Sequence, residues 1–142
     1  MSAGLQGLSR AVVLLSGGLD SLVAAHLAGR EYRLRLAVTA DYGQRAAGAE
    51  IAAAAHQAAV LGVEHQVVHL PWLGALSPSP ITNARATLPR LCPDDLDDHA
   101  AAGATAMAVW VPNRNGVLLM VAAAYAEALE CDVVVMGINA EE

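Results

Sequence analysis

The sequence predicts an α/β fold in which helices cover both faces of a doubly wound parallel sheet. Short runs rich in valine and leucine alternate with long alanine-rich runs, and a Ser-Gly-Gly turn joins the first two of these segments. Strands that are buried on both faces appear as continuous apolar runs, and parallel strands need a crossover helix between them. We therefore expect one domain over the 142 residues, with strand order 3-2-1-4.

The expected elements follow this alternation along the chain. The strands are expected at residues 11–15, 34–40, 64–70 and 132–137, and the helices at residues 20–29, 46–61 and 114–130. Gly62 is expected to stop the second helix. The last helix is apolar almost all round, so we expect it to be buried, with its methionine and Tyr125 packed in the core.

Residues 71–112 differ from the rest of the chain because they contain all six prolines. A loop of this length inside a compact domain usually has a function, so we expect a lid-like insertion over the site. The acidic run Asp94–His99 lacks the spacing of a calcium-binding loop and is expected to be solvated.

Composition excludes several classes of protein. A net charge of −6 argues against direct binding of nucleic acid. The chain has no uninterrupted apolar run of about 18 residues, so no membrane span is expected. The apolar stretch after Arg10 breaks at Ser16, which indicates a strand rather than a signal peptide. Cys92 and Cys131 form no Cys-x-x-Cys pair, and we expect a cytoplasmic protein.

The turn Ser16–Ser21, with the sequence Ser-Gly-Gly-Leu-Asp-Ser, has the character of a pyrophosphate site. Paired glycines allow a ligand to approach the backbone closely, and the N–H groups at a helix start favour an anion. Ser16 and Ser21 add hydroxyl donors, and Asp20 could hold a Mg²⁺ ion that bridges phosphates. A plain capped turn is the alternative. The residues expected to bind the nucleotide are Leu15, Ser16, Gly17, Gly18, Leu19, Asp20, Ser21 and Leu22.

Three further groups of polar residues are expected at the same edge of the sheet. The residues in question are Tyr42, Gln44 and Arg45 after the second strand, Asn113, Arg114 and Asn115 at the start of the last helix, and Asn139 and Glu141 after the fourth strand. Ligands bind at the carboxyl ends of strands in open α/β sheets. Arg114 opposes the helix dipole, and a bound anion would relieve this. Asn113 or Asn115 could cap the helix. For each group a solvated turn or terminus is the alternative.

The Ser16–Ser21 string lacks both the lysine of a Walker loop and the glycine spacing of a dinucleotide fold. It resembles the loop of the ATP pyrophosphatases, which split ATP into AMP and pyrophosphate. With Asp41–Arg45 and Val111–Asn115, the chain resembles one branch of that superfamily, the 7-cyano-7-deazaguanine synthases, from about residue 11 to its last residue. Leu70–Thr82 and Gly137–Glu142 extend the resemblance.

The resemblance implies an adenine nucleotide alpha hydrolase-like fold and an ATP- and Mg²⁺-dependent reaction. In that reaction 7-carboxy-7-deazaguanine attacks the α-phosphate of ATP, and ammonia then displaces AMP to give an amide. A second activation by ATP dehydrates the amide to the nitrile, on the route to queuosine. The resemblance implies catalytic roles for Asp20, Arg45 and Arg114. The implied substrate contacts are Tyr42, Gln44, Asn113, Arg114, Asn139 and Glu141.

The chain departs from the family in length. Family members are longer and bind zinc through four cysteines near the C-terminus, which this chain lacks. Residues 1–142 are therefore expected to form one ATP-pyrophosphatase-type domain without its last strand or strands, completed by self-association or by a missing C-terminal portion. An uncovered edge at Val133–Met136 would favour self-association. The competing interpretations are an inactive ATP-binding fragment and another AMP-forming ligase or sulfurtransferase of the superfamily.

Overall fold

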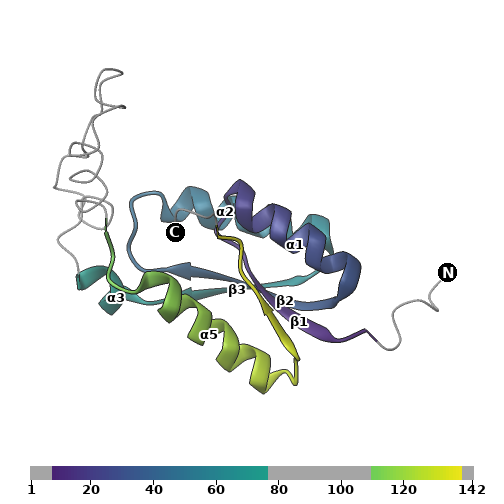
Figure 1. Cartoon of the computed structure of the whole chain (residues 1–142). Coiled ribbons are helices and arrows are strands. Elements are labelled where there is room, and N and C mark those ends of the chain that lie inside the picture. The colour runs from purple at the N-terminus through teal and green to yellow at the C-terminus, as the bar shows by residue number, and fades with distance from the viewer. Residues whose placement is uncertain (1–7, 77–109, 139–142) are drawn as a thin grey trace, which may run out of the picture.

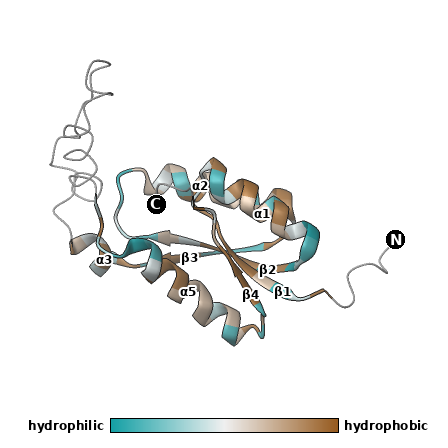
Figure 2. Cartoon of the chain, in the orientation of Figure 1, coloured by the Kyte–Doolittle hydropathy of each residue, from teal (hydrophilic) through white to brown (hydrophobic). Residues whose placement is uncertain are grey.

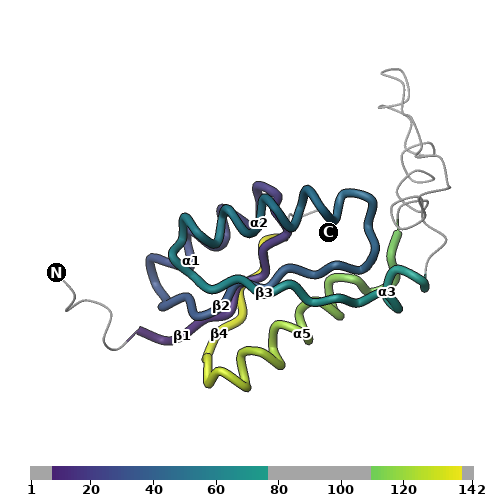
Figure 3. The backbone as a smooth tube through the Cα atoms, turned by 180° about the vertical axis from the view of Figure 1, so that it is seen from behind, coloured from purple at the N-terminus to yellow at the C-terminus, as the bar shows by residue number. Residues whose placement is uncertain are grey.

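The computed structural model describes residues 8–76 and 110–138 and contains a four-stranded sheet between layers of helices (Figure 1). The elements in chain order are β1 (Arg10–Leu14), α1 (Leu19–Glu31), β2 (Arg33–Asp41), α2 (Ala47–Leu61), β3 (Glu64–His69), α3 (Pro71–Ala75), α5 (Arg114–Ala128) and β4 (Val133–Val135). Helices α1 and α2 lie on one side of the sheet and α5 lies on the other, as the view from behind also shows (Figure 3).

The strand order is β3-β2-β1-β4, and every neighbouring pair is parallel. This confirms the predicted doubly wound sheet. In the register, Val13 of β1 lies between Ala37 of β2 and Val135 of β4. The carboxyl ends of β1 and β2, where the sequence places its turn motifs, therefore lie side by side.

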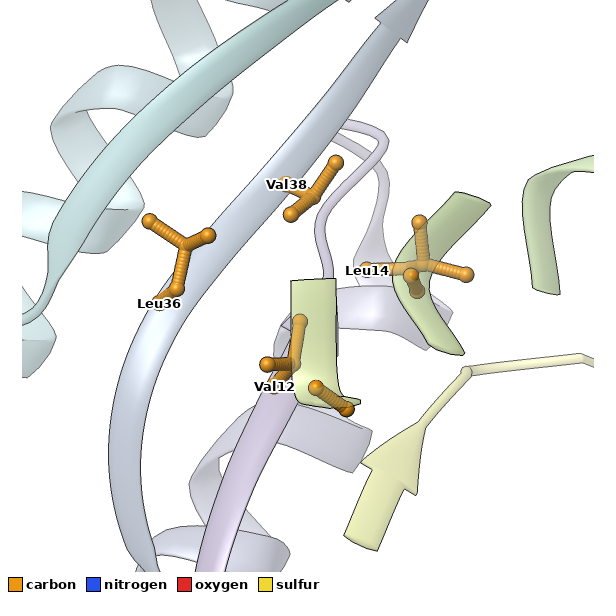
Figure 4. Close-up of a cluster of buried hydrophobic side chains, with 6 residues drawn as sticks. Val12, Leu14, Leu36 and Val38 are labelled. Carbon is orange, nitrogen blue, oxygen red and sulfur yellow. The ribbon is translucent and has the colours of Figure 1, made fainter. Parts of the chain in front are cut away.

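Alternating side chains of β1 and β2 supply two separate cores. Val12, Leu14, Leu36 and Val38 point toward α5 and pack with its two fully buried alanines, and they form the cluster in Figure 4. The intervening residues, among them Val13, pack with alanines of α1 and α2 on the opposite face. Because alanine is small, these helices approach the sheet closely while the strands provide most of the buried volume.

The expectation that the last helix is buried all round is wrong. Met120 is 63% exposed and Leu119 is 37% exposed, whereas Tyr125 packs against the core as predicted. The helix touches the sheet with one side only, and no described segment covers its other side. Helix α1 likewise exposes Leu19, Val23 and Leu27, which are spaced four residues apart and form one apolar stripe (Figure 2).

The segment at 71–112 begins differently from the expected loop. Its first residues form the short helix α3, which has Pro71 in its first turn and buries Leu73. Proline suits a helix start because its missing N–H is not needed there. The proposed lid, residues 77–109, lies outside the described residues. Helix α2 ends before Gly62, as predicted. No helix within residues 8–76 and 110–138 is long and apolar enough to cross a membrane.

A buried hydrogen-bond chain joins β3, β2 and the end of β1. The Thr39 hydroxyl donates to the carbonyl oxygen of Leu15 (2.7 Å) and lies 2.8 Å from Nε2 of His65. Since a hydroxyl has one hydrogen to donate, Nε2 of His65 must be the donor in the second bond. Burial lowers the pKa of His65, which keeps the ring neutral.

This pKa shift predicts that acid weakens the fold through His65. In the unfolded chain His65 takes up a proton near its ordinary pKa of 6.5, but in the folded chain it does so only at lower pH. The contribution of His65 to stability is therefore present above pH 6.5 and is lost as the pH falls through the folded pKa.

Urea unfolding between pH 7.5 and 5 should show this loss of stability. The His65→Gln variant should lose less stability, because the glutamine amide can still donate a hydrogen bond to Thr39 but does not titrate. His56→Gln, on the exposed side of α2, is the matched control. An equally steep loss in wild type and His65→Gln would show that another group is responsible.

We also predict self-association through the β4 edge. Within the described residues β4 pairs only with β1, and the two helices that contact it, α1 and α5, carry exposed apolar residues. Light scattering should detect oligomers of the wild-type protein, and the double variant Leu27→Glu, Met120→Glu should be monomeric. Val60→Glu, which changes an equally exposed residue of α2, should leave them intact. A monomer at high concentration contradicts this prediction.

Candidate nucleotide-binding site

A cavity of about 500 Å³ opens at the carboxyl ends of β1 and β2, where the sequence predicts ligand binding. Helix α2 borders it from one face of the sheet and the start of α5 from the other (Figure 1). The lining residues are Leu14, Leu15, Ser16, Gly17, Gly18, Ser21, Val38, Thr39, Ala40, Tyr42, Gln44, Ala49, Glu50, Ala53, Arg114, Asn115, Leu118, Met136 and Gly137. Ala40, Ala53, Leu118 and Met136 are partly exposed apolar residues of this lining, and we call them its apolar floor.

The turn after β1 is shaped by a close backbone contact at Gly17. Its φ is +81°, and a Cβ at this position would lie 2.6 Å from the carbonyl oxygen of Glu50. Gln57 of α2 adds a hydrogen bond from its Nε2 to the Gly17 carbonyl oxygen (3.1 Å). Only glycine combines this conformation with this contact, so Gly17 holds the turn against α2.

The two serines of the turn have different surroundings. Ser21 is 4% exposed, and its hydroxyl donates to the Gly18 carbonyl oxygen and accepts from the Ser16 N–H (both 3.1 Å). Ser16 is exposed at the cavity, with its hydroxyl 3.1 Å from that of Ser21. Ser21 was expected to donate to phosphate, but in this structure its hydroxyl closes the turn.

Three other predicted nucleotide contacts lie away from the cavity lining. Leu19 and Asp20 are exposed and Leu22 is half-buried. The Asp20 backbone is nevertheless close, because a Cβ at the lining residue Gly137 would collide with its carbonyl oxygen. The Asp20 backbone therefore lies beside the cavity lining, while its side chain is exposed and is not part of that lining. Among the described residues, no three acidic, histidine or cysteine side chains come together to hold a metal ion.

Gln44 binds the protein itself rather than an open site. It is 6% exposed; its Oε1 accepts from the Tyr42 N–H (2.9 Å), and its Nε2 donates to the Ala40 carbonyl oxygen (3.1 Å). Nε2 also donates to Oε2 of Glu50 (2.8 Å). The Gln44 amide was expected to bind a ligand. In the structure its hydrogen bonds stabilise the turn after β2.

Tyr42 and Arg114 meet across the cavity as the sequence predicted. Burial raises the pKa of the Tyr42 phenol, while the charge of Arg114 and a hydrogen bond with it oppose that rise. The negative charge of Glu50 adds to this rise, so Glu50 and Arg114 both lie near the Tyr42 phenol. The Arg114 Nε also donates to Oδ1 of Asn115 (3.0 Å), which orients the guanidinium.

The remaining predicted residues are not brought into the cavity lining. Arg45 is exposed outside it. Asn113 occupies the N-cap of α5 with φ +47°, but no side-chain hydrogen bond caps the helix, so the expected cap is absent. Asn139 and Glu141 lie outside the described residues, although Met136 and Gly137 just before them line the cavity.

Sequence reasoning missed Glu50. It is an isolated carboxylate in an alanine-rich run, and no motif contains it. One signal was available, because an acidic residue in the first turn of a helix that follows a strand lies near the carboxyl edge of the sheet.

The sequence model of the family described as queuosine biosynthesis protein QueC matches residues 10–142. The chain belongs to this family. It is 51% identical over 133 residues to a 7-cyano-7-deazaguanine synthase of Desulforudis audaxviator and 47% identical over 131 residues to one of Desulforamulus reducens. These matches cover 94% and 92% of the chain but 60% and 58% of the relatives, so the chain spans about three fifths of their length.

The fold is shared more widely than the family. The NMN synthetase of Francisella tularensis superimposes with a TM-score of 0.52 at 22% identity, over 94% of this chain and 47% of that one. At this identity the likeness concerns the fold alone, and it agrees with the predicted α/β architecture.

The Gly17 contact predicts an unusually costly glycine substitution. Gly17→Ala should lower the free energy of unfolding by about 2 kcal/mol or more, because strained φ and the collision with Glu50 act together. Gly43→Ala is the matched control, since Gly43 has φ +87° but open space around its Cβ position. It should lose only the conformational part, about 1 kcal/mol. Equal losses in urea unfolding would show that the contact contributes nothing.

Proposed function

We propose that the protein binds Mg-ATP in this cavity and takes part in ATP-dependent conversion of 7-carboxy-7-deazaguanine and ammonia to 7-cyano-7-deazaguanine. The observation that carries the proposal is the Ser16–Ser21 turn, which opens into the cavity at the start of α1 in a chain of this family. The names of the relatives support the nitrile product.

The turn supplies the donors that a leaving pyrophosphate needs. Its N–H groups lie at the N-terminal end of α1, where the helix dipole favours negative charge, and Ser16 is exposed beside them. Donors fixed in place before the reaction stabilise the charge that develops on the pyrophosphate without reorganisation. Asp20, whose backbone lies beside the cavity lining, is the residue that would hold Mg²⁺, and the ion would neutralise part of the charge on the phosphates.

The apolar floor suits a flat heterocycle. Ala40, Leu118 and Met136 line the cavity, keep part of their surface exposed and offer contact area without competing hydrogen bonds. Arg114, oriented by Asn115, is the proposed partner of the substrate carboxylate or the α-phosphate.

The proposed reaction has two activations. The substrate carboxylate attacks the α-phosphorus of ATP and releases pyrophosphate, and ammonia then displaces AMP from the acyl adenylate to form an amide. The amide oxygen attacks the α-phosphorus of a second ATP and releases a second pyrophosphate, and loss of AMP and of the two amide protons then leaves the nitrile. The chain's own residues bind, orient and neutralise charge, and no residue becomes a covalent nucleophile.

Nucleotide binding without turnover is a second candidate function. Asp20, the proposed Mg²⁺ contact, is exposed and lies outside the cavity lining. An enclosed active site excludes water from reactive adenylates. If further polypeptide is needed for that enclosure, this chain alone would bind ATP and form no nitrile.

A turnover assay separates the two functions. The protein is incubated with Mg-ATP, 7-carboxy-7-deazaguanine and ammonia, and AMP and nitrile are followed by mass spectrometry. We expect AMP only when the carboxylate substrate is present, and we expect Arg114→Ala to reduce it about 100-fold. Asp20→Ala should also abolish product.

Calorimetric titration with Mg-ATP accompanies the assay. ATP binding without AMP or nitrile would favour the binding function, and absence of ATP binding would contradict both. Exposed Arg30→Ala, on the last turn of α1, is the control that should change neither readout.

A further inference from the structure

The carboxylate of Glu50 has no role in the mechanism proposed above, yet it lines the cavity. Glu50 lies in the first turn of α2 and is half-buried. Within the described residues its carboxylate has one hydrogen bond, from Gln44 Nε2 to its Oε2 (2.8 Å). A carboxylate has about four acceptor positions, so most of its capacity remains for a ligand.

The position of this carboxylate is held from two sides. Gln44 is buried and bonded to the backbone at Tyr42 and Ala40, so it presents a rigid donor to Glu50. The backbone of Glu50 touches Gly17. The side chain is therefore anchored at both its root and one of its oxygens, as a selective contact requires.

The charges around the cavity limit what Glu50 can bind. Arg114 lines the same cavity from α5, and the charges of Arg114 and Glu50 both influence the pKa of Tyr42. An anionic group placed beside the Glu50 carboxylate would be repelled by it. This carboxylate therefore favours a part of the ligand that donates hydrogen bonds and carries no negative charge.

We propose that the Glu50 carboxylate is a specificity residue that accepts a hydrogen bond from the exocyclic amino group of the heterocycle bound on the apolar floor. This inference rests on the proposed function, since the adenine ring of ATP and the deazaguanine ring each carry one such amino group. A carboxylate in a partly dry site favours a ring with an N–H donor over a ring that lacks it, because loss of the donor leaves the charge unpaired.

Binding of matched ligand pairs tests the inference. ATP is compared with purine riboside triphosphate, which lacks only the 6-amino group. 7-Carboxy-7-deazaguanine is compared with its analogue without the 2-amino group. In wild type we expect one pair to differ about tenfold or more in Kd by calorimetry, the effect of one hydrogen bond to a charged group. The pair that differs identifies the ring that Glu50 reads.

Glu50→Gln is the decisive variant because its amide oxygen can still accept from Gln44 while the charge is lost. In this variant the Kd ratio of the discriminating pair should fall to about twofold or less, with an unchanged melting temperature. Glu127→Gln, an exposed change on α5, should keep the wild-type ratio.

Each other outcome overturns the inference in a recognisable way. If a pair differs in wild type and equally in Glu50→Gln, another group reads the amine. If ATP binds but neither pair differs, no group reads it, and in both cases the proposed function survives. If ATP does not bind at all, the proposed function fails together with the inference.

Discussion

The contact between Gly17 and the first turns of α2 is the constraint on which the rest of the site depends. It brings the turn after β1 against the helix after β2, although Gly17 and Glu50 are distant in sequence. The contact has a cost, because Gln57 donates to the Gly17 carbonyl while its own Oε1 is buried without a partner in the described part of the chain. An unpaired acceptor of this kind costs about 1–3 kcal/mol. The hydrogen bond from Gln57 to Gly17 therefore holds the turn in place at a cost in stability.

Opposite charges on the two faces of the sheet follow from the same arrangement. Helix α2 contributes Glu50 from one face and α5 contributes Arg114 from the other, above an apolar floor. Each charge has a neutral amide partner, Gln44 for Glu50 and Asn115 for Arg114. These amide hydrogen bonds orient the two charged side chains at the cavity.

Much of this arrangement could be predicted from sequence, since it rests on local patterns. The sequence predicted the parallel strand order and therefore which edge of the sheet carries the polar turn residues. Tyr42 and Arg114 meet at that edge. The exposure of Met120 could not be predicted, because hydropathy alone does not tell how many sides of a helix find a partner. Glu50 was not predicted for a related reason, because its position in the cavity depends on the packing of α2 against Gly17.

Ser21 and Gln44 show why a motif locates a site better than it assigns roles. Both belong to the strings that carry the family resemblance, and both were expected to contact ligand. In the structure the Ser21 hydroxyl closes its own turn, and the Gln44 amide joins the backbone after β2 to Glu50. A polar residue in a tight turn must first satisfy the turn's own donors and acceptors, because unpaired groups there are costly. The Ser16 hydroxyl is used in the same way, because it donates to Ser21 and accepts from the Gly18 N–H. The capacity left for a ligand is that which the turns do not use, and the acceptor positions of Glu50 beyond its bond with Gln44 are of that kind.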